Sequence, residues 1–135
     1  MIYVLDACAL IAYLNREPEG IRVKELIEST KLGNIDIYMC IVNLVEVYYG
    51  YVRDAGEMAA DAYMEAVSDL PIRIINTITD TVCREAARFK GLYSMSLADA
   101  FACGTAKSLN ATLVTKDSEI EAAQGKEHLS VLWIK

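Results

Sequence analysis

The chain has 135 residues, of which 54% are hydrophobic, and a formal net charge of −6 at pH 7. This length predicts one domain over residues 1–135 that buries its own core without disulfides. The acidic charge argues against a general binder of the phosphate backbone, which needs clustered Lys and Arg, and no apolar run is long enough to span a bilayer. A mean hydropathy of +0.24 favours one partner or self-association surface in addition to a core.

The first residues, MIYVLDACALIAYL, are apolar but differ from a secretory leader. They have no basic start, and Asp6 interrupts the apolar run, so we expect a cytosolic, membrane-free protein. The four cysteines form no CxxC pair, and His128 is the only histidine. This pattern argues against a zinc site or a disulfide framework.

Short β-favouring runs alternate with amphipathic helical segments along the chain. Strands are predicted at 1–5, 35–41, 72–75, 112–114 and 129–134, and helices at 9–14, 21–32, 43–55, 58–70, 80–90, 96–109 and 118–123. This alternation predicts a three-layer α/β/α fold with a parallel central sheet of about five strands. In such a sheet every strand ends on the same edge, which is where ligands bind.

Four carboxylates are predicted to meet at that edge. Asp6 and Asp117 each follow a strand, and Glu46 opens the helix after the second strand. Asp99 lies in the first turn of helix 96–109, which leads by a tight turn into strand 112–114. Because this helix and strand then run antiparallel, Asp99 stands beside Asp117 although they are 18 residues apart in the sequence.

The acids also have a simpler interpretation as residues at helix starts. Asp6 could cap the helical turn that follows it. Asn43 and Glu46 have the spacing of a capping box, and so do Ser96 and Asp99. Caps explain the residues one at a time but not their convergence on one edge, and the sequence leaves both interpretations open.

Four converging carboxylates need cations, because like charges raise each other's pKa. Hard oxygen ligands without histidine or paired thiols favour Mg²⁺ or Mn²⁺. Such a site suits phosphodiester hydrolysis, in which metal activates water and stabilises the leaving oxygen. If the metal neutralises four acids, the net charge becomes −6 + 4 = −2, so the acidity does not exclude a nucleic acid substrate.

The segments IYVLDACALIAYL, NLVEVYYG, SLADAFACGTA and ATLVTKD, in this order, resemble a PIN domain. In length and layout the chain is similar to VapC-type toxins of toxin–antitoxin pairs. The resemblance implies a metal-dependent endoribonuclease that cuts RNA, with Asp6, Glu46, Asp99 and Asp117 as its catalytic and metal-binding residues. It also implies a homodimer and inhibition by a cognate antitoxin protein.

Four further side chains are candidates to support these acids: Cys8, Asn43, Ser96 and Thr115. Thr115 resembles the polar residue that commonly precedes the last acid by two positions, and Ser96 is similar to the one that precedes the third by three. Cys8 stands where PIN domains often have Ser, Thr or Asn. Because a thiol is a poorer partner for Mg²⁺ than a hydroxyl, either metal affinity is lower or Cys8 faces the core.

Other functions compete with this interpretation. A haloacid-dehalogenase-like phosphatase needs a second acid two residues after the first, where this chain has Cys8. A signalling receiver domain needs an aspartate after the third strand, where the chain has Ile75 and Asn76. A PIN scaffold that binds RNA or a protein without cutting, and a housekeeping RNA-processing nuclease, are the alternatives within the PIN family.

Overall fold

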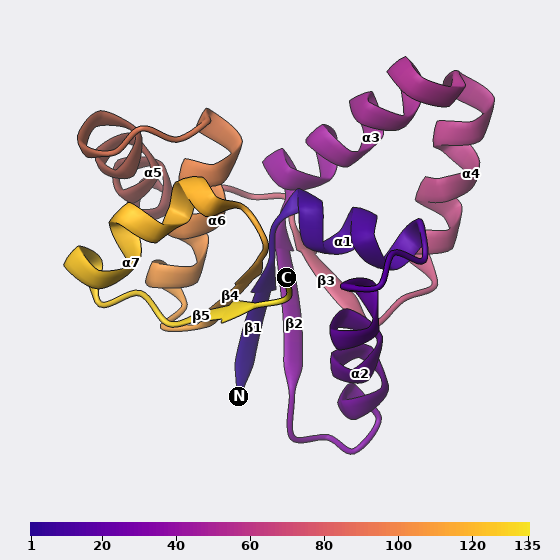
Figure 1. Cartoon of the computed structure of the whole chain (residues 1–135), viewed down its shortest axis with the longest axis horizontal. Coiled ribbons are helices and arrows are strands. Elements are labelled where there is room, and N and C mark those ends of the chain that lie inside the picture. The colour runs from indigo at the N-terminus through magenta and orange to yellow at the C-terminus, as the bar shows by residue number, and fades with distance from the viewer.

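A computed structural model describes residues 1–135 and has a five-stranded sheet between two groups of helices (Figure 1). The strand order is β3-β2-β1-β4-β5, and every neighbouring pair is parallel. This confirms the predicted three-layer α/β/α fold. The elements in chain order are β1 (Ile2–Leu5), α1 (Ala7–Leu14), α2 (Gly20–Thr30), β2 (Asp36–Cys40), α3 (Ile41–Ala55), α4 (Glu57–Ser68), β3 (Ile72–Ile75), α5 (Asp80–Leu92), α6 (Leu97–Ser108), β4 (Thr112–Thr115), the 3-10 helix η1 (Ser118–Ile120), α7 (Glu121–Glu127) and β5 (Val131–Trp133).

Both faces of the sheet are covered, so its strands are apolar on both sides. Helices α1 to α4 lie on one face and α5 to α7 on the other (Figure 1). In β1, Leu5 packs into the core under the first group and Val4 into the core under the second. Val114 and Leu113 of β4 divide between the two cores in the same way. The alternation follows from the two-residue period of a strand.

The strand order creates a switch point at the centre of the sheet. From β1 the chain proceeds outward to β2 and β3, and then returns to the other side of β1 to form β4 and β5. The register of β1 and β4 pairs Leu5 with Val114, and the Asp6 N–H donates to the Val114 carbonyl at 3.3 Å. The residues that follow these two strands therefore lie side by side at the edge where α/β proteins bind ligands.

Helix α3 begins two residues earlier than the sequence predicts. Its first residue is Ile41, and its N-cap is Cys40, whose side chain makes no capping hydrogen bond. The predicted capping box of Asn43 and Glu46 is therefore wrong, since Asn43 lies inside the helix and Glu46 in its second turn. The Asn43 amide is used elsewhere, because it donates to a carbonyl of α6.

Two helices extend further than the predicted ranges 80–90 and 118–123. Helix α5 includes Gly91 and ends at Leu92, while α7 includes Gly125 and ends at Glu127, and its C-cap His128 has a left-handed conformation with φ of 52°. Glycine is weakly helical but tolerated where tertiary contacts hold the helix. None of the helices combines the length and the apolarity that crossing a bilayer requires.

Glu127 joins the three helices of one layer. Its carboxylate on α7 accepts from Arg88 of α5 at 2.6 Å and from Lys107 of α6 at 2.8 Å, and Tyr93 donates to it as well. The Glu127 side chain is only 8% exposed. Hydrogen bonds from Arg88, Lys107 and Tyr93 hold the pKa of Glu127 well below its usual range, so the carboxylate stays ionised inside the layer.

We expect Glu127→Gln to lower the free energy of unfolding at pH 7 by about 1–3 kcal/mol, because the charged acceptor of three donors is lost. A depressed pKa gives stability that is present above the unfolded pKa of about 4.5 and is lost as the pH falls. The difference from wild type should therefore narrow in acid, as measured by urea unfolding at pH 7 and pH 3.5. Asp80→Asn, which removes the exposed partner of Arg84, is the control and should change little. Equal losses of stability in Glu127→Gln and Asp80→Asn would contradict the idea that the buried carboxylate contributes more than the exposed one.

Candidate active site

The four acids singled out from the sequence lie at the carboxyl edge of the sheet or in helices that start there. Asp6 follows β1 and Asp117 comes two residues after β4. Asp99 is in the first turn of α6, and Glu46 is in the second turn of α3. Asp6 and Asp99 are buried, while Glu46 and Asp117 are half-buried.

A tight carboxylate cluster forms around Asp99 and Asp117. One carboxylate oxygen from each of Asp99, Asp117 and Glu119 lies within 4.8 Å of the others. Glu119 was not predicted from the sequence, where an exposed acid at a helix start looks like any solvated acid. Its position two residues after Asp117, at the start of the helix that follows the strand, is the only signal of it. Three carboxylate oxygens at this separation are suitably placed to bind one cation.

Asp6 and Glu46 are outside this tight group but interact with it through their charges. The pKa of Asp6 is raised mainly by burial and further by the charge of Asp117, although the Thr115 hydroxyl and the Cys8 thiol act in the opposite direction. Burial, and then the charges of Asp6 and Asp117, raise the pKa of Glu46. The fold thus brings the four predicted acids within electrostatic reach of one another.

Asp99 is the most strongly affected of these acids. Its side chain is enclosed at the start of α6, and the residue is 6% exposed. Burial, a hydrogen bond shared with Asp117 and the charges of Asp117 and Asp6 together raise its pKa to about 8. Without a cation, Asp99 therefore keeps its proton at neutral pH.

The capping interpretation is also correct for part of the site. The Ala9 N–H donates to Asp6 Oδ1 at 2.9 Å, and the Glu119 N–H donates to Asp117 Oδ1 at 3.0 Å. The Asp99 N–H donates to Ser96 Oγ at 3.1 Å, which caps α6. Caps and convergence are compatible, because each cap fixes an acid or its helix at the sheet edge.

Cys8 faces Asp6 rather than the core. Its Sγ donates to Asp6 Oδ1 at 3.1 Å and lies 3.7 Å from Thr115 Oγ1. Burial and the Asp6 charge raise the pKa of the Cys8 thiol to about 12, so it stays protonated and acts as a weak donor. Thr115 Oγ1 in turn accepts from the Asp117 N–H at 2.9 Å. Cys8 and Thr115 therefore connect the first and last acids through short polar contacts.

Asn43 connects the helices that carry Glu46 and Asp99. Its Nδ2 donates to the Ala98 carbonyl at 3.0 Å, across 55 residues of sequence. Asn43 Oδ1 and Glu46 Oε2 are the two buried side-chain oxygens without a hydrogen-bond partner. They lie one helical turn apart, and an unsatisfied buried acceptor is unfavourable.

These features fit a bound divalent cation. Acids with raised pKa values and a buried oxygen without a donor are stabilised when a hard cation and its water molecules supply the missing positive charge and hydrogen bonds. Asp99, Asp117 and Glu119 are close enough together to share one ion. The charges of Asp6 and Asp117 act on Glu46, and that of Asp117 acts on Asp6, so these two acids are within electrostatic reach of the same ion.

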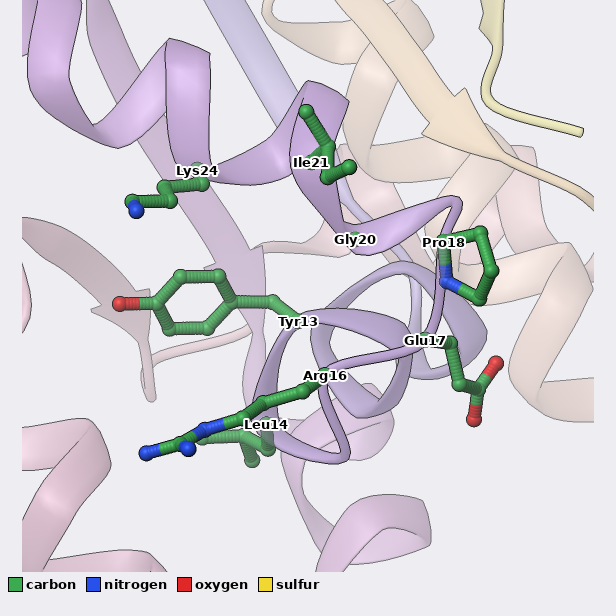
Figure 2. A pocket seen from close by; sticks show the side chains of 8 residues that line it. All are labelled: Tyr13, Leu14, Arg16, Glu17, Pro18, Gly20, Ile21 and Lys24. Atoms are coloured by element: carbon green, nitrogen blue, oxygen red, sulfur yellow. The ribbon is translucent and has the colours of Figure 1, made fainter.

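A cavity of about 760 Å³ lies in a different part of the molecule, where α1 ends and α2 begins (Figure 2). It contains none of the clustered acids. Figure 2 shows the Tyr13 ring between the side chains of Arg16 and Lys24, while Glu17 points to the opposite side. Its lining residues are Tyr13, Leu14, Arg16, Glu17, Pro18, Gly20, Ile21 and Lys24.

Fold and acids together define a class of proteins: three-layer α/β proteins with carboxylates gathered at the carboxyl edge of a parallel sheet. The sequence matches the PIN domain family over residues 3–126. The chain belongs to this family. The hypotheses of a haloacid-dehalogenase-like phosphatase and of a receiver domain are therefore wrong.

Solved structures with a similar fold include toxin–antitoxin proteins. VapBC2 from Rickettsia felis, bound to a promoter DNA fragment, has a TM-score of 0.74 at 19% identity, covering 98% of both chains. DNA-bound VapBC from Salmonella typhimurium has a TM-score of 0.73 at 19% identity, covering 100% of this chain and 99% of that one. VapC20 from Mycobacterium tuberculosis, a sarcin-ricin loop cleaving toxin, has a TM-score of 0.68 at 16% identity, covering 91% and 95%. The TM-scores show a shared fold at low sequence identity. Among curated proteins no match is found.

Proposed function

We propose that this protein is a metal-dependent endoribonuclease and the toxin of a toxin–antitoxin pair. The observation that carries the proposal is the cluster of Asp99, Asp117 and Glu119, with Asp6 and Glu46 within electrostatic reach. Membership of the PIN family and the similarity of fold to VapC toxins support the nuclease class. RNA is the proposed substrate, and Mg²⁺ or Mn²⁺ is the proposed cofactor.

The residues of the site would divide the work of phosphodiester hydrolysis. A divalent cation bound at this position would act as a Lewis acid toward water and the leaving oxygen. Asp99 and Asp117 would hold it, Asp6 and Glu46 would balance its charge, and Glu119 would offer an oxygen from the exposed side. The first turn of α6 directs backbone N–H groups to the same edge, which favours a nearby phosphate.

Four polar side chains would position the acids and would not contact the substrate: Cys8, Thr115, Ser96 and Asn43. Cys8 hydrogen-bonds Asp6, and Thr115 accepts from the backbone of Asp117. Ser96 caps α6, while Asn43 ties α3 to the peptide that precedes Asp99. Fixed carboxylate positions matter because charge-stabilising groups must already be in place when the transition state forms.

The same proposal includes a homodimer, a cytosolic location and a cognate antitoxin. Exposed apolar side chains would provide a surface for self-association: Val45 and Tyr49 on α3, Leu92 at the end of α5 and Leu97 at the start of α6. The neighbours from Rickettsia felis and Salmonella typhimurium are complexes of VapB with VapC, which supports a toxin rather than a housekeeping nuclease. A small DNA-binding protein encoded next to this chain would identify the antitoxin.

The direct test is cleavage of single-stranded RNA with and without metal. We expect cleavage in Mg²⁺ or Mn²⁺ that leaves 5′-phosphate ends, loss of cleavage in EDTA, and recovery when metal is added back in excess. The reason is that the Cys8 thiol beside Asp6 stays protonated, since its pKa is raised to about 12, so we expect water activated by the cation to be the nucleophile. End-labelled RNA on sequencing gels measures both rate and end chemistry. Cleavage that continues unchanged in EDTA would reject the metal mechanism.

A further inference from the structure

The cavity between α1 and α2 carries positive charge that no acid neutralises. Arg16 and Lys24 are exposed, and neither makes an ion pair, whereas most other cations of the chain have an acidic partner. The one acid of the cavity wall, Glu17, is bound to Lys116 at 2.8 Å. In a chain of net charge −6 this is a local surface suited to an anion.

An aromatic face lies between these two cations. Tyr13 is half-buried, and its ring extends between the Arg16 and Lys24 side chains in Figure 2. A ring flanked by cations suits a nucleotide, whose base stacks on an aromatic face while its phosphate contacts Arg or Lys. A cavity of about 760 Å³ lies within the usual range for a ligand of that size.

The backbone holds Arg16 over the cavity in an unusual conformation. Arg16 has φ of 55°, a left-handed value that is unfavourable for a residue with a side chain. Its N–H donates to the Tyr13 carbonyl at 3.1 Å, and the preceding Asn15 is tied to Tyr51 of α3 at 2.7 Å. These contacts fix the position from which the Arg16 side chain extends.

The cavity is linked to the acidic edge by the ion pair of Glu17 and Lys116. Lys116 directly precedes Asp117, and its N–H also donates to Cys8 Sγ at 3.4 Å. Because Glu17 lies on the side opposite to Arg16 and Lys24 in Figure 2, a strand of RNA whose scissile phosphate lies at Asp117 would cross the Glu17–Lys116 pair before it reaches these two cations. RNA is favoured over a protein partner because the cavity combines free cations and an aromatic ring with this continuity.

We propose that the cavity binds a flanking nucleotide of single-stranded RNA, with the base on Tyr13 and the phosphates on its two sides in contact with Arg16 and Lys24. The inference rests on the proposed ribonuclease function and adds to it a subsite that selects or positions the substrate. The base would be recognised mainly by stacking, which tolerates different bases.

The test measures RNA affinity separately from cleavage. In an Asp99→Asn background with Mg²⁺, a fluorescein-labelled single-stranded RNA of about 12 nucleotides is titrated by anisotropy at several salt concentrations. We expect Arg16→Ala/Lys24→Ala to weaken binding about tenfold and to reduce the slope of log K against log salt by about 1.4, since two phosphate contacts are lost. Tyr13→Leu should also weaken binding about tenfold.

Arg22→Ala/Lys31→Ala is the matched control, because it removes two unpaired cations outside the cavity. It should leave affinity and slope nearly unchanged, and circular dichroism checks that all variants fold. Equal weakening by both pairs, no weakening by either, or no RNA binding by the parent would overturn the subsite. Metal-dependent cleavage with unchanged affinity in all variants would reject the subsite but not the nuclease. RNA binding through Arg16 and Lys24 without cleavage in any metal would support the subsite and reject the nuclease.

Discussion

Replacing Asp99 with asparagine is expected to reduce metal-dependent RNA cleavage by about 10²–10³-fold and to stabilise the metal-free protein. Cleavage falls because a ligand that holds the cation loses its charge. Stability rises because Asp99 is 6% exposed and lies next to Asp117, so its ionised form is unfavourable without a cation. Thermal unfolding in EDTA and single-turnover cleavage in Mn²⁺ measure the two effects on one preparation.

The stability gain should depend on pH in a defined direction. A carboxyl group whose pKa is raised from 3.8 to about 8 on folding contributes stability at low pH that is lost as the pH rises through this range. The wild type should therefore lose stability between pH 4 and pH 8 in EDTA, and Asp99→Asn should lose less. Asp69→Asn, at an exposed position after α4, is the control and should follow the wild type. A metal-free Asp99→Asn protein less stable than wild type at pH 8 would contradict the electrostatic account.

Gly20→Ala is expected to destabilise the protein by about 3 kcal/mol, because two helices approach too closely for a side chain at this position. A Cβ atom at Gly20 would lie 2.3 Å from the Ala12 carbonyl oxygen and 2.9 Å from the Tyr13 Cα. Both are backbone atoms, so α2 must move away from α1. The Ala12 carbonyl also accepts from the Glu17 N–H at 2.9 Å, and the shift would disturb that contact.

Gly50→Ala is expected to have the opposite effect and to stabilise the protein. Gly50 is inside α3, and the only neighbour of a Cβ there is the flexible end of Arg53 at 4.0 Å. Alanine is the better helix former, so this variant should gain about 0.5–1 kcal/mol. Urea unfolding of both variants measures the contrast. If Gly20→Ala were as stable as Gly50→Ala, the tight approach of α1 and α2 would be refuted.

The alternation of strands and helices was sufficient to predict the layers of the fold and the edge at which the acids lie. Asp6 and Asp117 could be placed because residues after parallel strands share one edge. Asp99 could be placed because a tight turn forces α6 to run back beside β4. The order of the strands was not predictable in this way, since alternation alone does not say on which side of β1 each later strand is added.

Most of the features that the sequence did not predict depend on contacts between segments that are distant in the chain. Asn43 has the right spacing for a capping box, but its amide instead binds a carbonyl 55 residues away. Helices α5 and α7 extend beyond the predicted ranges 80–90 and 118–123, and Glu127 of α7 holds α5 through Arg88 and α6 through Lys107. Apart from its position two residues after Asp117, nothing in the local sequence distinguishes Glu119 from a surface acid. Local propensity loses to tertiary packing at each of these positions.

Because the acids at the sheet edge repel one another, the stability of this protein should depend on the concentration of free divalent cations. A cation that binds only the folded chain raises its stability in proportion to the logarithm of the free ion concentration. Chelation would therefore leave a molecule that opens more often and is digested faster by proteases. On this reasoning, the supply of divalent ions in the cell would set the lifetime of the protein as well as its activity.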